Sequence, residues 1–290
     1  MLKPAELQQR ANLIQEVRNF FLAQQYLEVD TPIRQPVLIP EAEIQPLTSE
    51  DHFLQTSPEL CMKRLLAAGC TQIFQICPCF RRGERGRLHQ EEFTLLEWYH
   101  IGWSYHELMT ECEAMICQIA GQKTLCRAGK EISLASPWQR LSVADAFQRY
   151  AGISPEQAIE QDCFDLLLVE KVEPNLGWQQ PVFLYDYPIA LASLARPKAG
   201  NPELAERFEL YIAGIELANG FSELIDPVIQ RQRFHEELRR TGGQMPEKFL
   251  KALEQLNDCA GIALGLDRLF MLLMGRESIA HVLPFAEDDL

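Results

Sequence analysis

The segment Phe80–Tyr99 reads FRRGERGRLHQEEFTLLEWY and places a basic loop between two predicted strands, Thr71–Phe80 and Phe93–His100. The positively charged side chains of this loop are Arg81, Arg82, Arg85, Arg87 and His89. Guanidinium groups bond phosphate oxygens two at a time, so arginines clustered on a rigid hairpin suit a polyphosphate ligand. On charge alone, a solvated hairpin tip is the more common explanation of the same pattern.

The composition limits the possible function classes. The chain has 290 residues and a formal net charge of -14, which argues against a broad nucleic-acid or anionic-membrane surface. Any anion site must therefore be local. Nine cysteines and a polar start without an apolar leader predict reduced thiols in a cytoplasmic protein. No apolar run reaches membrane-spanning length, so no membrane partner is expected.

Cys77 and Cys79 lie two residues apart on a predicted strand, so both side chains should point to one face. A structural zinc site needs further ligands, and no second ligand pair is evident. Buried structural cysteines are the favoured interpretation.

Capping signals and periodicity predict the order of elements. An amphipathic helix over 4–25 runs into a strand over 26–32, and further helices begin near Ser57 and Ser104. The pattern loosens over about 122–180, interpreted as a small inserted helical subregion within one domain spanning 1–290. Later strands are expected at 181–187, 207–212, 215–223 and 261–266, with helices at 227–240, 246–256 and 267–274. Clustered antiparallel strands flanked by helices predict an α+β fold.

A glycine-containing strand forms a second candidate anion site. Residues 261–268 read GIALGLDR, and glycine within a strand marks a close approach of a ligand or another backbone. Arg268 then falls in the first turn of the next helix, where the free amide groups favour anions. A tightly packed strand–helix corner explains this segment equally well.

Acidic residues gather between these two arginine sites in the sequence. Glu209, Glu216 and Glu223 accompany Asn219, and such side chains can hold Mg²⁺ or a substrate ammonium group. A solvated acidic edge is the alternative. Glu59, in a predicted first helical turn, can equally be a carboxylate stabilised by the helix dipole.

Taken together, these segments resemble the class II aminoacyl-tRNA synthetases. The three signature motifs correspond to the helix–strand ending at Pro32, to Phe80–Tyr99 and to Gly261–Arg268. TSPE at 56–59, ERFE at 206–209 and ELANGFSEL at 216–224 resemble the lysine branch. With MKRLLAAGC at 62–70 and GIALGLDRL from 261, the chain is similar from end to end to the lysyl-tRNA synthetase paralogues, the elongation factor P–(R)-β-lysine ligases.

The resemblance implies a class II catalytic domain with an antiparallel sheet flanked by helices, acting as a homodimer across the first motif. It implies ATP as co-substrate, Mg²⁺, an aminoacyl-adenylate made from (R)-β-lysine or lysine, and elongation factor P as the acceptor protein. The first motif begins near residue 4, which leaves no room for an anticodon-binding domain. The acidic balance also argues against tRNA as the acceptor.

The resemblance also implies the role of each residue. Arg81 would bind the α-phosphate and the substrate carboxylate, and Arg268 the γ-phosphate; these are the two expected catalytic residues. Other expected contacts to ATP are Arg82, Gly83, Glu84, His89, Gln90, Phe93 (stacked on adenine), Glu216, Leu217 and Gly265. Glu209 and Glu216 would coordinate Mg²⁺. The expected amino-acid pocket comprises Ser57, Pro58, Glu59, Tyr99, Asn219, Glu223 (pairing with the side-chain ammonium) and Ala263.

The chain departs from the family pattern in its ATP loop. Arg81-Arg82-Gly83-Glu84 replaces Arg-Asn-Glu-Glu, so Glu84 either takes over the missing acid's contact to adenine or that contact is lost. His89-Gln90-Glu91-Glu92 replaces His-Asn-Pro-Glu, so the loop loses a proline restraint. Ala263 stands where lysyl-tRNA synthetases have glycine, and its methyl group could displace the substrate backbone, as a shifted amino group would require.

Two alternatives remain open at this point. A truncated synthetase could still charge tRNA or another amine acceptor. A catalytically silent regulatory paralogue would need eroded catalytic positions, and the phosphate-binding arginines are intact.

Overall fold

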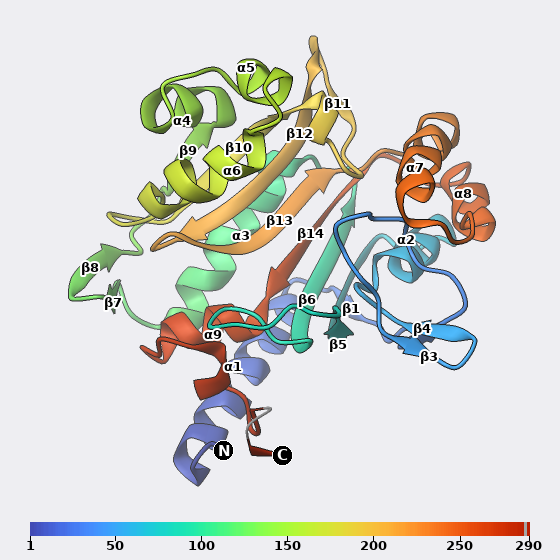
Figure 1. Cartoon of the computed structure of the whole chain (residues 1–290). Helices are drawn as coiled ribbons and strands as arrows, with labels where there is room; N and C mark the ends of the chain where they lie inside the picture. Colours follow the sequence, from blue (N-terminus) through green and yellow to red (C-terminus); the bar gives the residue numbers. More distant parts are fainter. Residues whose placement is uncertain (287–288) are drawn as a thin grey trace. The chain divides into compact units, whose positions relative to one another are not determined.

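The structure is a computed structural model that describes residues 1–286 and 289–290 (Figure 1). The chain divides into two compact units. The first unit comprises Met1–Gly102, Leu224–Cys259 and Ala263–Leu290, and the second comprises Trp103–Glu223 and Ala260–Ile262. Among the residues described, no helix is long and apolar enough to cross a membrane.

The first unit is built on a sheet of β1 (Leu27–Glu28), β5 (Gln72–Phe80), β6 (Glu92–Ile101) and the end of β14 (Cys259–Gly265), in that order. β5 and β6 form the predicted antiparallel hairpin, in which Phe74 lies opposite Trp98 and Cys79 opposite Phe93. The strand expected over 26–32 is shorter than predicted, because only Leu27 and Glu28 pair with β5. The Val29 amide still donates to the Phe74 carbonyl at 2.9 Å, and the ladder ends there.

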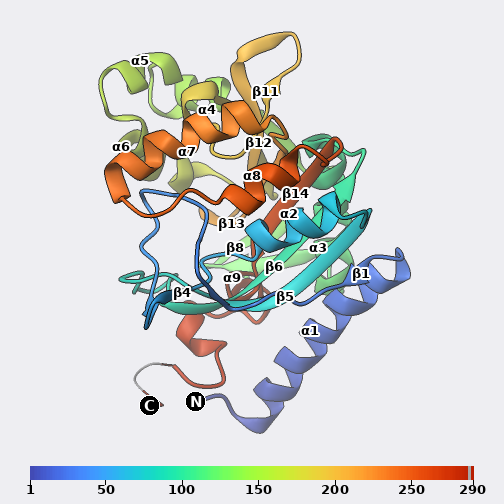
Figure 2. The same ribbon diagram turned by 90° about the vertical axis from the view of Figure 1, so that its right-hand side faces the viewer.

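The two faces of the β5–β6 hairpin have different partners. Helix α1 (Pro4–Ala23) covers one face, where the Phe21 ring stacks on Phe74 with centroids 4.8 Å apart and lies 5.2 Å from the Trp98 ring. Side chains alternate along a strand, so the residues in phase with Cys79 and Phe93 point to the opposite face. Figure 2 shows α1 on one side of β5 and α2 (Glu59–Ala67) on the other.

Helices and short strands complete the first unit. α2 packs against α8 (Glu247–Leu253), which packs against α7 (Pro227–Thr241), and α9 (Leu266–Leu273) follows β14 directly. A small sheet has the order β2 (Arg34–Gln35), β4 (His52–Leu54), β3 (Thr48–Ser49), and η4 (Ile279–His281) lies near the carboxyl end. The helices predicted over 227–240, 246–256 and 267–274 are therefore present, with ends shifted by a few residues.

The second unit holds a sheet of the middle of β14, β13 (Ile215–Ser222), β12 (Asn201–Ile212), β10 (Val182–Pro188) and β9 (Gln139–Ser142), in that order. β11 (Pro197–Lys198) pairs with β12, and η3 (Ile189–Leu191) follows β10. The β10–β12 and β12–β13 pairs are antiparallel, and β9 runs parallel to β10. The antiparallel-dominated α+β fold is as predicted.

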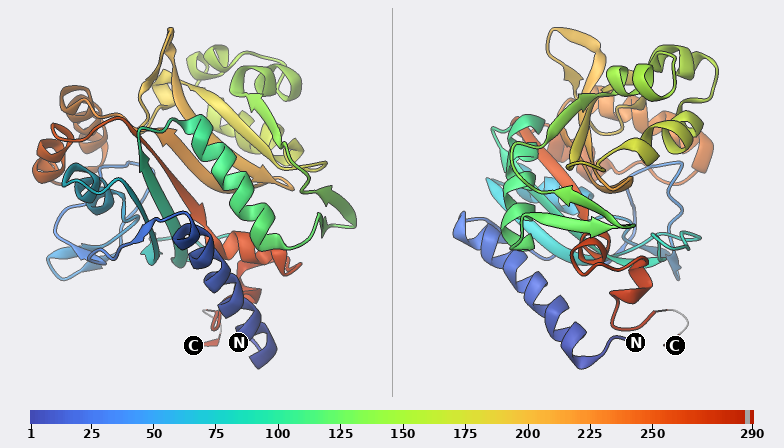
Figure 3. Two further views of the ribbon diagram at one scale, coloured as in Figure 1. Left: turned by 180° about the vertical axis from the view of Figure 1, so that it is seen from behind. Right: turned by 90° about the vertical axis from the view of Figure 1, so that its left-hand side faces the viewer.

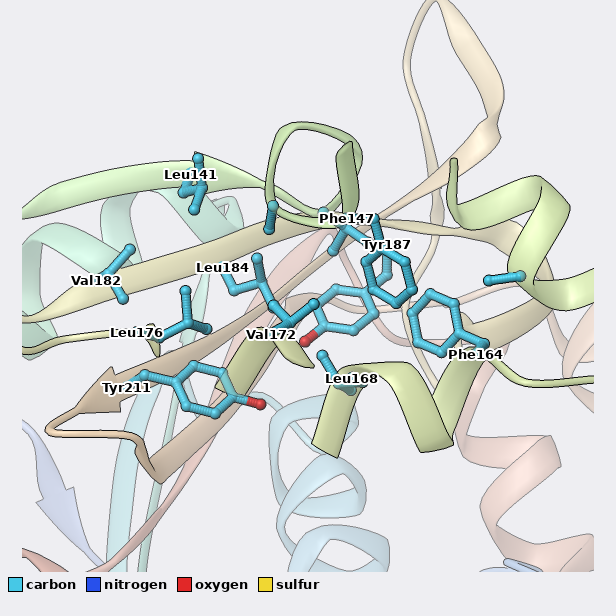
Figure 4. Close-up of a cluster of buried hydrophobic side chains, with 13 residues drawn as sticks. Leu141, Phe147, Phe164, Leu168, Val172, Leu176, Val182, Leu184, Tyr187 and Tyr211 are labelled. Atoms are coloured by element: carbon cyan, nitrogen blue, oxygen red, sulfur yellow. The ribbon is translucent and has the colours of Figure 1, made fainter. Parts of the chain in front are cut away.

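Helices cover both faces of this sheet (Figure 3). α3 (Tyr105–Ala120), capped by Ser104 as predicted, lies on one face. On the other face are α4 (Val143–Tyr150), α5 (Pro155–Glu160), α6 (Phe164–Leu167), η1 (Leu168–Val172) and η2 (Glu173–Asn175). Between these helices and the sheet lies a buried apolar cluster that includes Phe147, Phe164, Leu184, Tyr187 and Tyr211 (Figure 4).

The segment 122–180 is not helical throughout, which corrects the prediction. It opens with a hairpin of β7 (Thr124–Arg127) and β8 (Lys130–Ser133), continues into β9, and becomes helical only at Val143. Ala128 and Gly129 both have positive φ, 49° and 73°, which is the geometry of a two-residue hairpin turn. Strands of four residues with an Ala-Gly turn carry too weak a sequence pattern to be recognised.

Gly220 on β13 allows a close approach within the second unit. A Cβ at this position would lie 2.7 Å from Cζ of Phe208 and 2.9 Å from Cβ of Ile262. Glycine is therefore needed here for packing, and Asn219, its neighbour on the strand, points to the other face.

Candidate active site

The arginine-rich loop between β5 and β6 is held closed by Glu91. The Glu91 backbone carbonyl accepts from the Arg81 amide (2.9 Å), and its carboxylate accepts from the Gly83 amide and from the Arg85 guanidinium, both at 2.7 Å. The hydrogen bonds from Arg85 and Gly83 lower the pKa of Glu91, so it stays ionised. These bonds replace the restraint that the family's proline supplies at this position.

Arg81 lies against Phe93 at the base of this loop. The guanidinium carbon is 5.1 Å from the centroid of the Phe93 ring, and a terminal nitrogen is 3.9 Å from the Glu84 carboxylate. Its Nε is buried and has no hydrogen-bond partner among the described residues. The arginine is therefore oriented by its ring contact and retains a donor for a ligand.

Arg82 and Gln90 occupy less central places in the loop. The Arg82 amide donates to the Gln45 carbonyl at 2.7 Å, and its side chain lines a cavity of about 730 Å³ with segments 36–46 and 238–244. Gln90 is half-buried in the loop. Of the two adjacent arginines, Arg81 is the one aligned with Phe93.

Arg268 reaches the same loop from α9. Its Nε donates to the Leu88 carbonyl at 3.1 Å, and a terminal nitrogen lies 2.7 Å from Nε2 of His89. Guanidinium only donates, so Nε2 of His89 must be the accepting nitrogen of a neutral ring. Partial burial, then Arg268 and Arg81, lower the pKa of His89. Both predicted catalytic arginines therefore lower the pKa of the same histidine, His89.

Asp267 fixes the start of α9. One carboxylate oxygen accepts from the Thr94 amide at 2.6 Å, and the other pairs with Arg10 at 2.8 Å. The carboxylate is buried, so this pair ties α9 to β6 and α1 within the first unit. Gly265 is the residue that caps α9, one turn before Arg268.

The predicted amino-acid pocket of the first unit contains a carboxylate that the sequence interpretation missed. Glu97 is buried and accepts from the Ser57 hydroxyl at 2.6 Å and from the Tyr99 hydroxyl at 3.0 Å. Burial, reinforced by repulsion from Glu59, raises the pKa of Glu97 to about 8. Its place two residues before Tyr99 on one strand face was the available signal.

Glu59 is held in the same pocket by Lys63. The ammonium of Lys63, itself buried, forms an ion pair with the Glu59 carboxylate one helical turn away. The Glu59 amide donates to Ser57 Oγ at 3.0 Å, and Pro58 precedes α2. Ala263 packs on the same face of the strand pair, against Phe93 and the cysteines of β5, which are in phase with Glu97 and Tyr99.

In the second unit, Glu209 is enclosed by three donors. Its carboxylate accepts from the hydroxyls of Tyr187 (2.5 Å) and Tyr211 (2.6 Å) and from Arg207 (2.7 Å). Burial and then Glu209 raise the pKa values of both tyrosines, so the hydroxyls keep their protons. Both carboxylate oxygens accept hydrogen bonds in this arrangement, and the role of Glu209 as a Mg²⁺ ligand stays a prediction.

Glu216, Asn219 and Glu223 lie along β13. Asn219 faces Glu209 across the β12–β13 pair, and Glu216 faces Tyr211. The side-chain oxygen of Asn219 is buried without a hydrogen-bond partner in the part of the chain that the structure describes. Glu223 is buried at the end of the strand, and Leu217 is buried within it. Within the described residues, no three His, Cys, Asp or Glu side chains gather closely enough to hold a metal ion.

The predicted residues thus assemble into two sets. In the first unit these are Ser57, Pro58, Glu59, Arg81, Glu84, His89, Phe93, Tyr99, Ala263, Gly265 and Arg268, and in the second Glu209, Glu216, Asn219 and Glu223.

Residues 3–289 match the family model of the class II tRNA synthetases (D, K and N). The chain belongs to this family. Three relatives, from Salmonella dublin, Salmonella paratyphi B and Salmonella heidelberg, are each named elongation factor P–(R)-β-lysine ligase. Each is 37% identical over 321 residues, covering 97% of this chain and 95% of the relative. Membership of the class II family makes the chain an ATP-dependent ligase and confirms the predicted fold class.

Proposed function

We propose that this protein activates (R)-β-lysine, or lysine less well, as an adenylate and transfers it to the ε-amine of a lysine on elongation factor P. The observation that carries the proposal is the 37% identity to ligases of that name over 97% of the chain. The intact Arg81 and Arg268, which meet at one loop, support the adenylation step.

In the first step, a substrate carboxylate oxygen attacks the α-phosphorus of ATP, and pyrophosphate leaves with the electrons of the broken P–O bond. A carboxylate is already ionised at neutral pH, so no general base is needed. Arg81, oriented by Phe93, neutralises charge on the α-phosphate, and Arg268 holds the γ-phosphate. His89 is neutral, so it leaves the Arg268 charge for the nucleotide.

The other residues predicted to contact ATP are proposed to do so as well. Arg82, Gly83, Glu84 and Gln90 surround the nucleotide from the loop, and Leu217 and Gly265 contact it from β13 and β14. Glu84, within 3.9 Å of Arg81, is the acid available for the adenine edge.

Magnesium is proposed at Glu216. The fit rests on the half-buried Glu216, which lies near enough to Arg207 and Tyr211 to raise their pKa values. Mg²⁺ would neutralise charge on the leaving pyrophosphate. Glu209, held by Arg207 and two tyrosines, is proposed as the second Mg²⁺ ligand.

In the first unit, Glu59 and Glu97 are proposed to meet a substrate ammonium group, with Tyr99 beside them and Ser57 and Pro58 shaping the turn. In the second unit, Glu223 is the carboxylate proposed to pair with the side-chain ammonium, and Asn219 the neighbouring polar group. The Ala263 methyl group would exclude the backbone position of an α-amino acid and so favour the β-isomer.

In the second step, the neutral ε-amine of the acceptor lysine attacks the acyl carbon of the adenylate. An amide bond forms, the bond to the phosphate oxygen breaks, AMP leaves and the amine gives up a proton. We propose that residues 1–290 act as a catalytic domain, in the cytoplasm and as a homodimer. Cysteines that are all free support the reducing compartment.

Pyrophosphate exchange tests the first step. With (R)-β-lysine, the protein should exchange labelled pyrophosphate into ATP, and Arg268→Ala should abolish the exchange with the melting temperature unchanged. Arg231→Ala, an exposed arginine of α7 that is paired with Glu247, is the matched control. Absence of exchange with either lysine isomer at high enzyme concentration would refute adenylation.

Acceptor identity is tested separately. Elongation factor P incubated with the protein, ATP and (R)-β-lysine should gain the mass of one β-lysyl group. If label from lysine appears instead on tRNA, the truncated-synthetase alternative is correct.

A further inference from the structure

Two thiols on the site face of β5 lie close enough to act together. Sγ of Cys77 and Sγ of Cys79 are 3.9 Å apart, and both side chains are buried. They form a cluster with Leu95, against which the partly buried side chains of Phe93 and Ala263 pack. Both cysteines are free, so the pair is a dithiol.

The spacing fits a single thiolate-bound cation without movement of the backbone. A cation about 2.3 Å from each sulfur, a typical metal–thiolate distance, would subtend an S–cation–S angle of about 116° across the 3.9 Å gap. That angle suits a three-coordinate site; a two-coordinate Cu(I), which is close to linear, needs the two sulfurs to move slightly farther apart by rotation of the side chains. The apolar members of the cluster, Leu95, Phe93 and Ala263, offer no ligand, and the charged groups that act on Cys79 are Glu97 and Arg81.

The ligand set selects the class of cation. A pair of thiolates disfavours Mg²⁺ and Ca²⁺, which require oxygen ligands. Four-coordinate structural zinc is disfavoured as well, because it takes more protein ligands than this pair supplies. Soft thiolates select Cu(I), which accepts low coordination numbers.

We propose that Cys77 and Cys79 form a binding site for one soft monovalent cation of the Cu(I) class. Both S–H bonds break, two S–Cu bonds form, and two protons pass to the solvent; the copper stays monovalent and no electron is transferred. Metal binding must displace these protons, so affinity rises with pH. Burial raises the pKa of Cys79, and Glu97 raises it further while Arg81 lowers it.

The location predicts an inhibitory role, which rests on the proposed function. Phe93 is the proposed adenine platform, and Ala263 lines the proposed amino-acid pocket; these two side chains also cover the dithiol. A cation that reaches the sulfurs must therefore displace them, and a bound nucleotide should hold them in place. Copper and ATP are expected to exclude one another.

The test is an anaerobic titration of the full-length protein with Cu(I) in competition with a chromophoric Cu(I) chelator. The wild-type protein should bind one tight Cu(I), and Cys77→Ser and Cys79→Ser should each weaken it at least 100-fold by removing the chelate. Cys126→Ser, an exposed cysteine outside the pair, is the control and should retain the site. Equal Cu(I) affinity in the wild type and both pair variants would overturn the proposal.

Binding is measured without turnover, so its failure is separate from failure of the ligase proposal. Cys77→Ala and Cys79→Ala provide second variants if the serine hydroxyl disturbs folding, which thermal melting reports. Saturating ATP should slow Cu(I) uptake at the pair. Uptake that depends on both cysteines but is unaffected by ATP would support the dithiol site and contradict its inhibitory role.

Discussion

Arg268 could be predicted as a site residue from the sequence, whereas Glu97 could not. Arginines in an acidic chain stand out by charge, and both predicted arginines lie at the expected loop. Glu97 sits within the apolar run LLEWY, where one acid looks like an ordinary strand residue. Its burial and its two hydroxyl partners appear only when Ser57, distant in sequence, is brought beside it.

The raised pKa of Glu97 gives a pH-dependence for substrate binding. With a pKa of about 8, Glu97 is largely protonated at neutral pH and ionises as the pH rises. We expect KM for (R)-β-lysine to fall several-fold between pH 6.5 and 8.5, because the ionised form attracts the ammonium group. Glu97→Gln should raise KM and flatten this dependence, measured by pyrophosphate exchange. Parallel pH profiles for the two proteins would contradict the role.

The same shift has a consequence for stability. A carboxyl group with a raised pKa in the folded state stabilises the protein fully below its unfolded pKa, near 4.5, and this contribution is lost as the pH rises to about 8. Glu97→Gln should therefore lose less stability than the wild type between pH 5 and 8. Chemical denaturation of both proteins at several pH values measures this difference in the free energy of unfolding.

Glu91 offers a second residue-level test. Glu91→Ala removes the acceptor of the Gly83 and Arg85 hydrogen bonds and should raise KM for ATP about 3- to 10-fold, the effect of one or two such bonds. Glu92→Ala, its exposed neighbour, is the control. An unchanged KM for ATP in Glu91→Ala would show that the loop closes without this carboxylate.

Elements with strong local signals could be predicted, and those without them could not. The hairpin β5–β6 and helix α3 carry alternation or a capping box, and both are present. β7 and β8 are only four residues each, and β1 pairs over two residues. The geometry around Glu209 also escaped prediction, because Tyr187 reaches it from β10, another strand.

Gly220 tests packing within an element. Gly220→Ala would place a methyl group within 3 Å of Phe208 and Ile262, and overpacking of this kind typically costs about 1–3 kcal/mol. Because the ring is a main obstacle, Phe208→Leu should partly rescue Gly220→Ala in a double-mutant cycle. Additive losses of unfolding free energy would mean that the two side chains do not compete for space.

At the scale of the whole molecule, assembly is the property left to test. The segment of the first motif exposes Leu22 (52%), Leu27 (55%) and Ile33 (40%), as expected for residues covered in a homodimer. Leu27→Asp should shift sedimentation from dimer to monomer. Leu166→Asp, equally exposed (57%) in the second unit, should leave the dimer intact. A monomeric wild-type protein would refute the proposed homodimer.

The hydrogen bonds that the Glu91 carboxylate accepts in the ATP loop have one further consequence. A proline ring would restrict the ATP loop at any salt concentration. The Glu91 carboxylate restricts it only while the Gly83 amide and the Arg85 guanidinium remain bound to it. Arg85 is exposed, so dissolved salt weakens its attraction to Glu91. The affinity for the nucleotide should therefore decline with ionic strength at salt concentrations that leave the fold intact. Salt concentration would then adjust the rate of turnover.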